Sequence, residues 1–371
     1  MTKNNPFILS LYTFIAAIFI LSPCSGSGLK ADEKMIFFPT YGRALDSTGL
    51  WEIFIHGWVF EENLSSDTNR FFQINQMPHQ SQDDENPQIF KHRIQGFMVD
   101  NERRKKISLH ILDQMRTLSH LTRPNGHVED SFKLRLNKAQ QQLALQSGLD
   151  FVGVDNQGKV TAFKGTVYLL PQEGWSVISD IDDTIKISNV RDKKELFKNT
   201  FYRPFQVVPG MAELYRQWTQ QPGANIHYVS AAPWQLYAPL SQFFQQENFP
   251  LGTYHMKFFR WKDSSFFNLF QSPITYKMRV IQPLLTHFPR RKFILVGDSG
   301  EKDPEVYGEL ARLYPRQIIK IFIRNVSDEQ PHNKRMQAAF INIEPATWQL
   351  FADPKEIQFP EKTVTPAVVA P

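Results

Sequence analysis

The sequence has little cysteine, little net charge and few long apolar runs. Cys24 is the only cysteine among 371 residues, so a disulfide within the chain is excluded. The formal net charge is only +5, which is too small to indicate a nucleic-acid partner. A weakly positive chain is compatible with acidic partners such as phosphorylated lipids. The length is sufficient for two domains.

One apolar run stands out, and it lies at the N-terminus. Lys3 precedes apolar residues 6–21, and small and turn-forming residues follow at 22–28. This layout predicts a signal peptide over residues 1–28, and hence export to the periplasm, the cell envelope or the medium. The run is short for a spanning helix, but an uncleaved membrane anchor is the alternative. Lipidation at Cys24 is a further alternative, although Pro23 fits a lipoprotein cleavage site poorly.

Residues 31–170 predict a smaller, mostly β accessory domain. The segment 51–60 is rich in aromatic and β-branched residues, and 156–158 has the composition of a hairpin turn. Residues 139–144 favour a short helix. The basic cluster 103–106 is either a solvated turn or a phosphate-binding patch.

From residue 171 to 330, short apolar runs alternate with helical patterns, which is typical of a parallel sheet with helices on both faces. The predicted strands are 175–178, 225–230, 292–297 and 317–323, and the predicted helices include 234–247 and 277–287. Asp303 is placed to cap a further helix. Residues 331–371 predict a C-terminal extension with a disordered end, in which Trp348, Leu350 and Phe351 are candidates to dock on the sheet.

Polar residues stand where three predicted strands end. Asp180 and Asp182 follow the first strand, Ser230 ends the second and Asp298 follows the third. Ligands of open α/β sheets bind outside the carboxyl ends of the strands. Crowded carboxylates repel one another unless a divalent cation gathers them, so the pattern favours a metal site, although an acidic turn is the simpler alternative for Asp180 and Asp182 alone.

These residues carry a family resemblance over roughly residues 171–330. The motifs Asp-Ile-Asp-Asp-Thr at 180–184, Ser230, Lys277 and Gly-Asp-Ser-Gly at 297–300 resemble the haloacid dehalogenase superfamily. The surrounding residues look like the actin-patch-type, Mg²⁺-dependent phosphatidate phosphatases. Ala231 and Ala232 depart from the expected pattern, because a polar residue is expected before Pro233. The resemblance implies a haloacid-dehalogenase-like Rossmannoid parallel sheet with helices on both faces, preceded by the β domain.

The resemblance also implies roles for individual residues. Asp180 would be the nucleophile that forms an aspartyl-phosphate, and Asp182 would act as general acid and then base. Mg²⁺ is the implied cofactor, held by Asp180, the backbone carbonyl of Asp182 and Asp298. Asp303 would either orient the metal's waters or Lys277, or only cap its helix. The implied phosphate-binding residues are Thr184, Ser230, Ala231 and Lys277, and Lys277 is also counted as catalytic.

The implied substrate is phosphatidate at a membrane surface. The short spacing between the motifs leaves no room for a large cap domain, which suits an open site. Aromatic residues and cations alternate over 258–270, which favours either a membrane interface or a buried segment. Two alternatives stay open: a phosphatase of another phosphomonoester, such as a phosphoprotein or a soluble phosphate, and a non-catalytic secreted lipid-binding module. The sequence identifies no protein partner.

Overall fold

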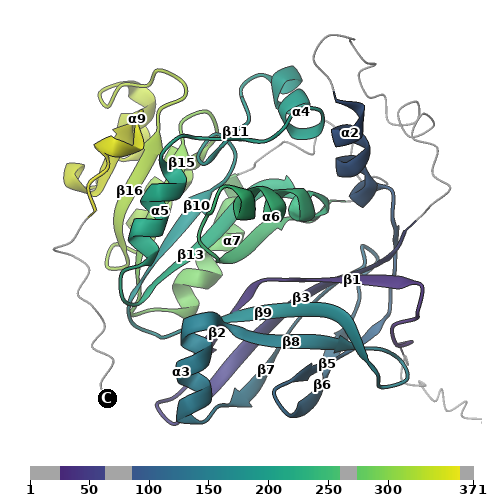
Figure 1. Ribbon diagram of the computed structural model, residues 1–371. Helices are drawn as coiled ribbons and strands as arrows, with labels where there is room; N and C mark the ends of the chain where they lie inside the picture. The colour runs from purple at the N-terminus through teal and green to yellow at the C-terminus, as the bar shows by residue number, and fades with distance from the viewer. Residues whose placement is uncertain (1–25, 63–85, 260–273, 360–371) are drawn as a thin grey trace, which may run out of the picture.

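The computed structural model describes residues 26–62, 86–259 and 274–359 (Figure 1). The predicted signal peptide lies almost wholly outside these residues, as do most of the aromatic segment 258–270 and the loose C-terminal end. Within the described parts of the chain, no helix is both long enough and apolar enough to cross a membrane.

The N-terminal unit is built on a nine-stranded sheet. All of its strand pairs are antiparallel except the pair of β2 with β9. The strands are β1 (Glu33–Phe38), β2 (Thr40–Ala44), β3 (Leu50–Glu61), β4 (Asp100–Asn101), β5 (Lys106–Ile111), β6 (Gln114–Leu121), β7 (His127–Arg135), β8 (Leu149–Val154) and β9 (Val160–Leu170). Helix α3 (Lys138–Ser147) starts with a capping box between Asn137 and Gln140, and α2 (Pro87–Ile94) starts at Asn86, whose side chain accepts from Gln88 N–H.

The basic cluster 103–106 is not one solvated turn. Lys105 is buried, where its ammonium contacts the carboxylate of Glu33 and lies 3.0 Å from Glu102. Arg103 and Lys106 are exposed. Burial of an ammonium requires paired carboxylates, and Glu33 and Glu102 supply them, so Lys105 is a structural residue of this unit.

The second unit contains a six-stranded sheet in which every pair is parallel. Its order is β14 (Thr253–Lys257), β13 (Ala224–Pro233), β10 (Trp175–Asp180), β15 (Lys292–Asp298), β16 (Ile318–Arg324) and β17 (Trp348–Phe351). Counted along the chain, this is the doubly wound order 3-2-1-4-5-6, which reverses between β10 and β15. Such a switch point leaves a crevice at the carboxyl ends of these two strands.

Helices cover both faces of this sheet (Figure 1). Successive residues of a strand point to opposite faces, and Val177 and Ile178 accordingly belong to different apolar cores. The core around Val177 includes α4 (Lys193–Phe201), α5 (Met211–Thr219) and α6 (Tyr237–Gln246), the last preceded by the 3₁₀ turn η2 (Trp234–Leu236). The core around Ile178 includes α7 (Ile274–His287), α8 (Asp303–Leu313) and α9 (Lys334–Ala339).

The sheet extends beyond the boundary expected at residue 330. Residues Trp348–Phe351 form β17, which pairs with β16 through contacts such as Phe351 with Arg324. The segment expected to be a C-terminal extension therefore contributes the sixth strand. The short strands β11 (Lys186–Ile187) and β12 (Gln206–Val207) pair with each other between β10 and α5.

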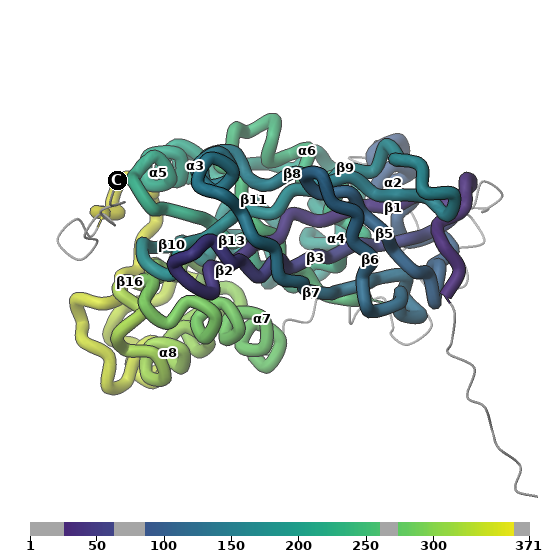
Figure 2. Tube along the Cα trace, turned by 90° about the horizontal axis from the view of Figure 1, so that it is seen from below, coloured from purple at the N-terminus to yellow at the C-terminus, as the bar shows by residue number. Residues whose placement is uncertain are grey.

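The two units share one core. Phe38, at the end of β1, packs against Trp234 and Tyr237 of the second unit, with ring centroids 4.1 and 4.9 Å apart. The backbone N–H of Tyr254 donates to Pro39 O at 3.3 Å. Seen from below in Figure 2, the first sheet lies in front of the second unit. The parallel sheet is thus fixed against the β unit.

Three buried histidines, His56, His127 and His227, and the partly buried His255 lie in or near this shared core. His56 Nε2 is 3.0 Å from His127 Nδ1, and His227 Nδ1 is 2.7 Å from Thr253 Oγ1. Burial lowers the pKa of His127 to about 3 and that of His255 to about 4. It also lowers the pKa values of His56 and His227 well below the usual range. All four side chains are therefore neutral at physiological pH.

Candidate active site

The loop after β10 places the first carboxylate. Asp180 is the last residue of the strand and is buried, and its Oδ2 accepts a hydrogen bond from Thr184 Oγ1 at 3.2 Å. Asp183 adopts a left-handed conformation with φ of 55°. Its carboxylate accepts from the backbone N–H groups of Ser188 (2.7 Å) and Val190 (2.6 Å). Asp183 thus holds the loop that presents Asp180.

Lys277, near the start of α7, lies at the centre of the site. Its Nζ is 2.7 Å from Asp180 Oδ1 and 3.0 Å from Glu301 Oε2, and it also contacts Asp303 Oδ1. Asp180 and Lys277 are 97 positions apart in the chain. Both side chains are almost fully buried, so this ion pair depends on the network around it.

Asp298 ends β15, beside Asp180. Its Oδ1 accepts from the backbone N–H groups of Gly300 (2.6 Å) and Glu301 (3.0 Å). Its Oδ2 is buried and has no hydrogen-bond partner. A buried carboxylate oxygen without a partner is costly, so this atom is available for a cation.

Asp303 does not cap its helix, contrary to the expectation from the Asp-Pro-Glu pattern. The residue before α8 is Lys302, whose side chain makes no capping hydrogen bond. The Asp303 carboxylate turns inward instead, where it contacts Lys277 and accepts from Asp298 N–H at 3.1 Å. A Cβ at Gly297 would lie 2.3 Å from Asp303 Oδ2, so only glycine allows this close approach.

Burial and neighbouring charges shift the ionisation of this cluster. Burial raises the pKa values of Asp180 and Asp298 well above the usual range, and the surrounding carboxylates add to the shift. Burial alone would lower the pKa of Lys277, because it disfavours the charged ammonium. The carboxylates of Asp180, Asp303 and Glu301 outweigh burial and raise the Lys277 pKa well above its usual value. The cluster therefore has more negative charge than Lys277 alone can balance.

These side chains fit a hard divalent cation. Carboxylate oxygens of Asp180, Asp298 and Asp303 lie within 4.8 Å of one another, and all three residues are buried. Oxygen donors of this kind are the ligands of Mg²⁺, which uses few carboxylates together with water and phosphate oxygens. The free Oδ2 of Asp298 is the atom that most needs a cation.

The Asp182 carboxylate points away from this group. Its Oδ1 lies 2.7 Å from Lys186 Nζ and accepts from Ser188 Oγ at 2.7 Å, while its Oδ2 accepts from Ser230 Oγ at 3.0 Å. Burial would raise the pKa of Asp182, but Lys186 and the hydroxyls of Ser188 and Ser230 outweigh burial and lower it. Asp182 is thus held ionised. Its side chain is not among the three clustered carboxylates.

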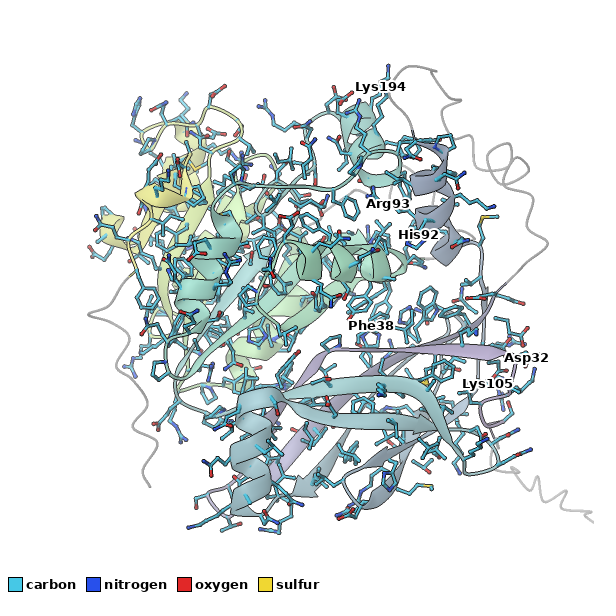
Figure 3. All side chains as sticks on the ribbon, viewed as in Figure 1. Asp32, Phe38, His92, Arg93, Lys105 and Lys194 are labelled. Atoms are coloured by element: carbon cyan, nitrogen blue, oxygen red, sulfur yellow. The ribbon has the colours of Figure 1, made fainter. Side chains whose placement is uncertain are left out.

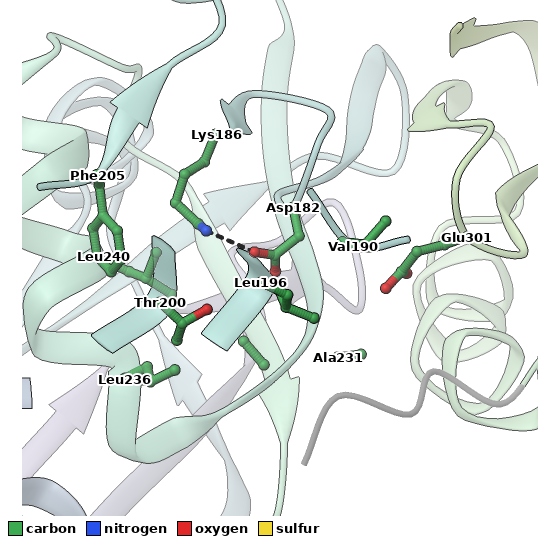
Figure 4. Close-up of a pocket in the computed structure, with 11 residues that line it drawn as sticks. Asp182, Lys186, Val190, Leu196, Thr200, Phe205, Ala231, Leu236, Leu240 and Glu301 are labelled. Atoms are coloured by element: carbon green, nitrogen blue, oxygen red, sulfur yellow. Dashed lines mark ion pairs between the residues drawn. The ribbon is translucent and has the colours of Figure 1, made fainter. Parts of the chain in front are cut away.

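A narrow pocket opens beside Asp182 (Figure 4). Ala231 lies in its wall, and Ser230 is fixed nearby because its Oγ accepts from Ala232 N–H at 2.9 Å. Figure 4 shows Lys186 and Phe205 on one side of Asp182 and Glu301 on the other. The remaining wall is mostly apolar and is formed by Val190, Leu196, Thr200, Ala232, Leu236 and Leu240.

The structure brings the predicted residues to one edge of the sheet. Asp180, Thr184, Lys277, Asp298 and Asp303 form a connected network. Asp182 and Ala231 line the adjoining pocket, and Ser230 donates a hydrogen bond to Asp182.

Three residues of the site were not singled out from the sequence. Glu301 binds Lys277, Lys186 binds Asp182, and Asp183 fixes the loop. Asp183 lies inside the motif at 180–184, and Lys186 and Glu301 lie within two residues of the two motifs, so their position was the available signal. Their partners depend on side-chain directions that the motif spacing does not give.

This region matches a known family. Residues 175–325 match the family model described as phosphatidate phosphatase APP1, catalytic domain. The match supports an APP1-type phosphatidate phosphatase catalytic domain in this part of the chain.

Two curated relatives are similar over the same part. An uncharacterized protein of Schizosaccharomyces pombe is 32% identical over 174 residues, which is 46% of this chain and 28% of that protein. Phosphatidate phosphatase APP1 of Saccharomyces cerevisiae is 36% identical over 177 residues, which is 46% of this chain and 30% of that protein. The chain thus covers less than a third of the length of these two relatives.

Proposed function

We propose that the protein is a Mg²⁺-dependent phosphatidate phosphatase with a haloacid-dehalogenase-like catalytic domain, which releases diacylglycerol and phosphate. The observation that carries this proposal is the convergence of Asp180, Lys277, Asp298 and Asp303 at the switch point of a parallel sheet. The strand order and the similarity to the APP1 catalytic domain support the fold and the reaction class. The predicted export signal at residues 1–28 remains a proposal, which N-terminal sequencing of the mature protein tests.

Asp180 acts as the nucleophile in the first chemical step. A carboxylate oxygen of Asp180 forms a bond to phosphorus while the bond from phosphorus to the lipid alcohol oxygen breaks, which leaves an aspartyl-phosphate. Lys277 contacts this carboxylate and orients it, and the ammonium offsets negative charge during transfer. When bound by Asp180, Asp298 and the Asp182 carbonyl, with Asp303 nearby, Mg²⁺ supplies the positive charge that the carboxylate cluster and the phosphate require.

Asp182 moves the protons. Its ionised carboxylate is ready to take a proton from the water that hydrolyses the aspartyl-phosphate. The earlier step needs a protonated Asp182, because its carboxylic acid donates a proton to the leaving alcohol oxygen. We propose that phosphate binding draws the Ser230 hydroxyl away from Asp182, so that the carboxylate loses a donor and its pKa rises.

The shape of the site favours a lipid over a soluble ester. The pocket beside Asp182 is bounded mainly by aliphatic and aromatic side chains. The group that leaves from phosphorus must pass near Asp182, because Asp182 donates its proton. An apolar wall at that position suits a glycerolipid better than a sugar phosphate or a phosphoprotein.

The Asp180→Asn variant tests the nucleophile. We expect the fold to persist and the release of phosphate from phosphatidate in Mg²⁺ to fall by at least a thousandfold, because an amide does not form the acyl-phosphate. Asp150→Asn, on β8 of the other unit, is the matched control. Near-normal activity of Asp180→Asn would refute the nucleophile assignment.

A substrate panel tests the lipid. Phosphatidate in mixed micelles and soluble phosphomonoesters are assayed with Mg²⁺ and after chelation. Preference for soluble esters would refute the lipid substrate, and turnover that survives chelation would refute the metal.

A further inference from the structure

We propose a second ligand site, for an uncharged single-chain acylglycerol, in the pocket between the two units. This pocket has a volume of about 280 Å³, which is close to the lower end of the range of small-molecule sites, about 300–1,000 Å³. The β unit contributes Trp58 and Phe60, α2 and the turn after it contribute His92 and Met98, and the start of α6 contributes Ala238. Figure 3 labels His92, which lines the pocket from α2, and Phe38 of β1, whose ring packs against Trp234.

Two residues that line this pocket each carry a buried polar atom without a partner. Trp234 is 3% exposed, and its indole Nε1 makes no hydrogen bond. Gln235 Oε1 is also buried and makes none, although Gln235 Nε2 donates to Phe259 O at 3.0 Å. Trp58, which lines the same pocket, has its indole N–H bonded to Asn101 Oδ1 at 2.7 Å. The residues that line the pocket therefore carry one spare donor and one spare acceptor, beside apolar side chains such as Phe60 and Met98.

These features select the chemistry of the ligand. A carbonyl oxygen would accept from Trp234 Nε1, and a hydroxyl would donate to Gln235 Oε1. No lysine or arginine is found among the described residues that line the pocket, and Glu62 is its acid, so an anionic headgroup is disfavoured. An acyl chain joined by an ester to a glycerol carries the required carbonyl, hydroxyl and apolar tail.

The pocket is separate from the phosphate site but adjoins it. Trp234 and Gln235 line the pocket between the two units. Leu236, the next residue of η2, lines the pocket beside Asp182. The inference does not depend on phosphatase activity, because none of its contacts involves the carboxylate cluster. Binding is therefore measurable in the full chain without turnover.

Calorimetric titration with 1-decanoylglycerol, below its micelle concentration, tests the site. Ala238 is an exposed residue of α6 that lines the pocket, so Ala238→Phe fills the site with little effect on the core. We expect saturable binding that Ala238→Phe weakens by about tenfold or more. Ala139→Phe, at an exposed alanine of α3, is the matched control and should leave the affinity unchanged. Absence of saturable binding, or equal affinities of the two variants, would overturn the proposal.

A comparison of ester and ether lipids tests the polar contact. 1-O-Decylglycerol lacks the carbonyl oxygen, so it should bind native protein about fivefold more weakly than 1-decanoylglycerol. Trp234→Phe keeps an aromatic ring but removes the N–H, and the difference between the two lipids should then disappear. A difference that persists in Trp234→Phe would refute the indole as the donor.

Discussion

The neutral buried histidines predict a loss of stability in mild acid. Below pH 6.5, histidines in the unfolded chain take up protons, whereas His127 and His255 remain neutral in the folded protein because burial lowers their pKa values to about 3 and about 4. The unfolded state therefore binds more protons, and the free energy of unfolding falls as the pH falls. The loss begins near the unfolded pKa and is complete near the folded values.

The size of the effect follows from these pKa values. Protonation at pH 5 favours an unfolded histidine by about 2 kcal/mol relative to pH 8. His127 and His255 together therefore cost about 4 kcal/mol at pH 5, and His56 and His227 act in the same direction. This is a large part of a typical domain stability of about 5–15 kcal/mol.

Urea unfolding followed by tryptophan fluorescence at pH 8, 6 and 5 measures the effect. Asp180 and Asp298 act in the opposite direction, because their raised pKa values favour protonation in the folded state. The decisive quantity is therefore the difference between variants. His127→Gln should reduce the dependence of stability on pH by about 1.2 kcal/mol per pH unit between pH 6 and 5, whereas the exposed His332→Gln should not. Equal slopes in the parent and His127→Gln would refute the reasoning.

Three further substitutions probe the site. Lys277→Met leaves buried carboxylates without their cation and should lower the free energy of unfolding by about 3–5 kcal/mol in urea titrations; an unchanged midpoint would contradict the buried network. Gly297→Ala places a methyl against the Asp303 carboxylate and should lower kcat by about a hundredfold, and full activity would show that this approach is not required. Ser188→Ala removes a donor from Asp182, so its apparent pKa in the pH profile of kcat/KM should rise by about one unit; an unshifted profile would argue against this role.

The central strands could be predicted from the sequence because parallel strands are buried on both faces. The segments 175–178 and 292–297 are therefore mainly apolar, with Ser176 and Lys292 as exceptions, and both lie within observed strands. Strand β14 was missed, since the polar and partly buried His255 interrupts its apolar pattern. Strand β17 has only four residues, too few for a periodic signal.

The sequence was sufficient to predict which residues form the site, but not how their side chains are arranged. The ends of parallel strands meet at one edge, so the grouping of Asp180 with Asp298 follows from the strand pattern. The direction of Asp182 does not follow, because the chain turns at Asp183 with a positive φ. The role of Asp303 was equally ambiguous, since an acid before a proline at a helix start commonly caps that helix. Only the tertiary fold brings Lys277 close enough to bind the Asp303 carboxylate instead.

Strand β17 determines how far this protein could be shortened. The family match ends at residue 325, but a protein cut there would lose residues 348–351 and leave β16 as a bare outer strand. Its unpaired backbone N–H and C=O groups would then be free to recruit the same strand of another molecule, which leads to aggregation. A stable minimal fragment must therefore continue past Phe351, the last residue of β17.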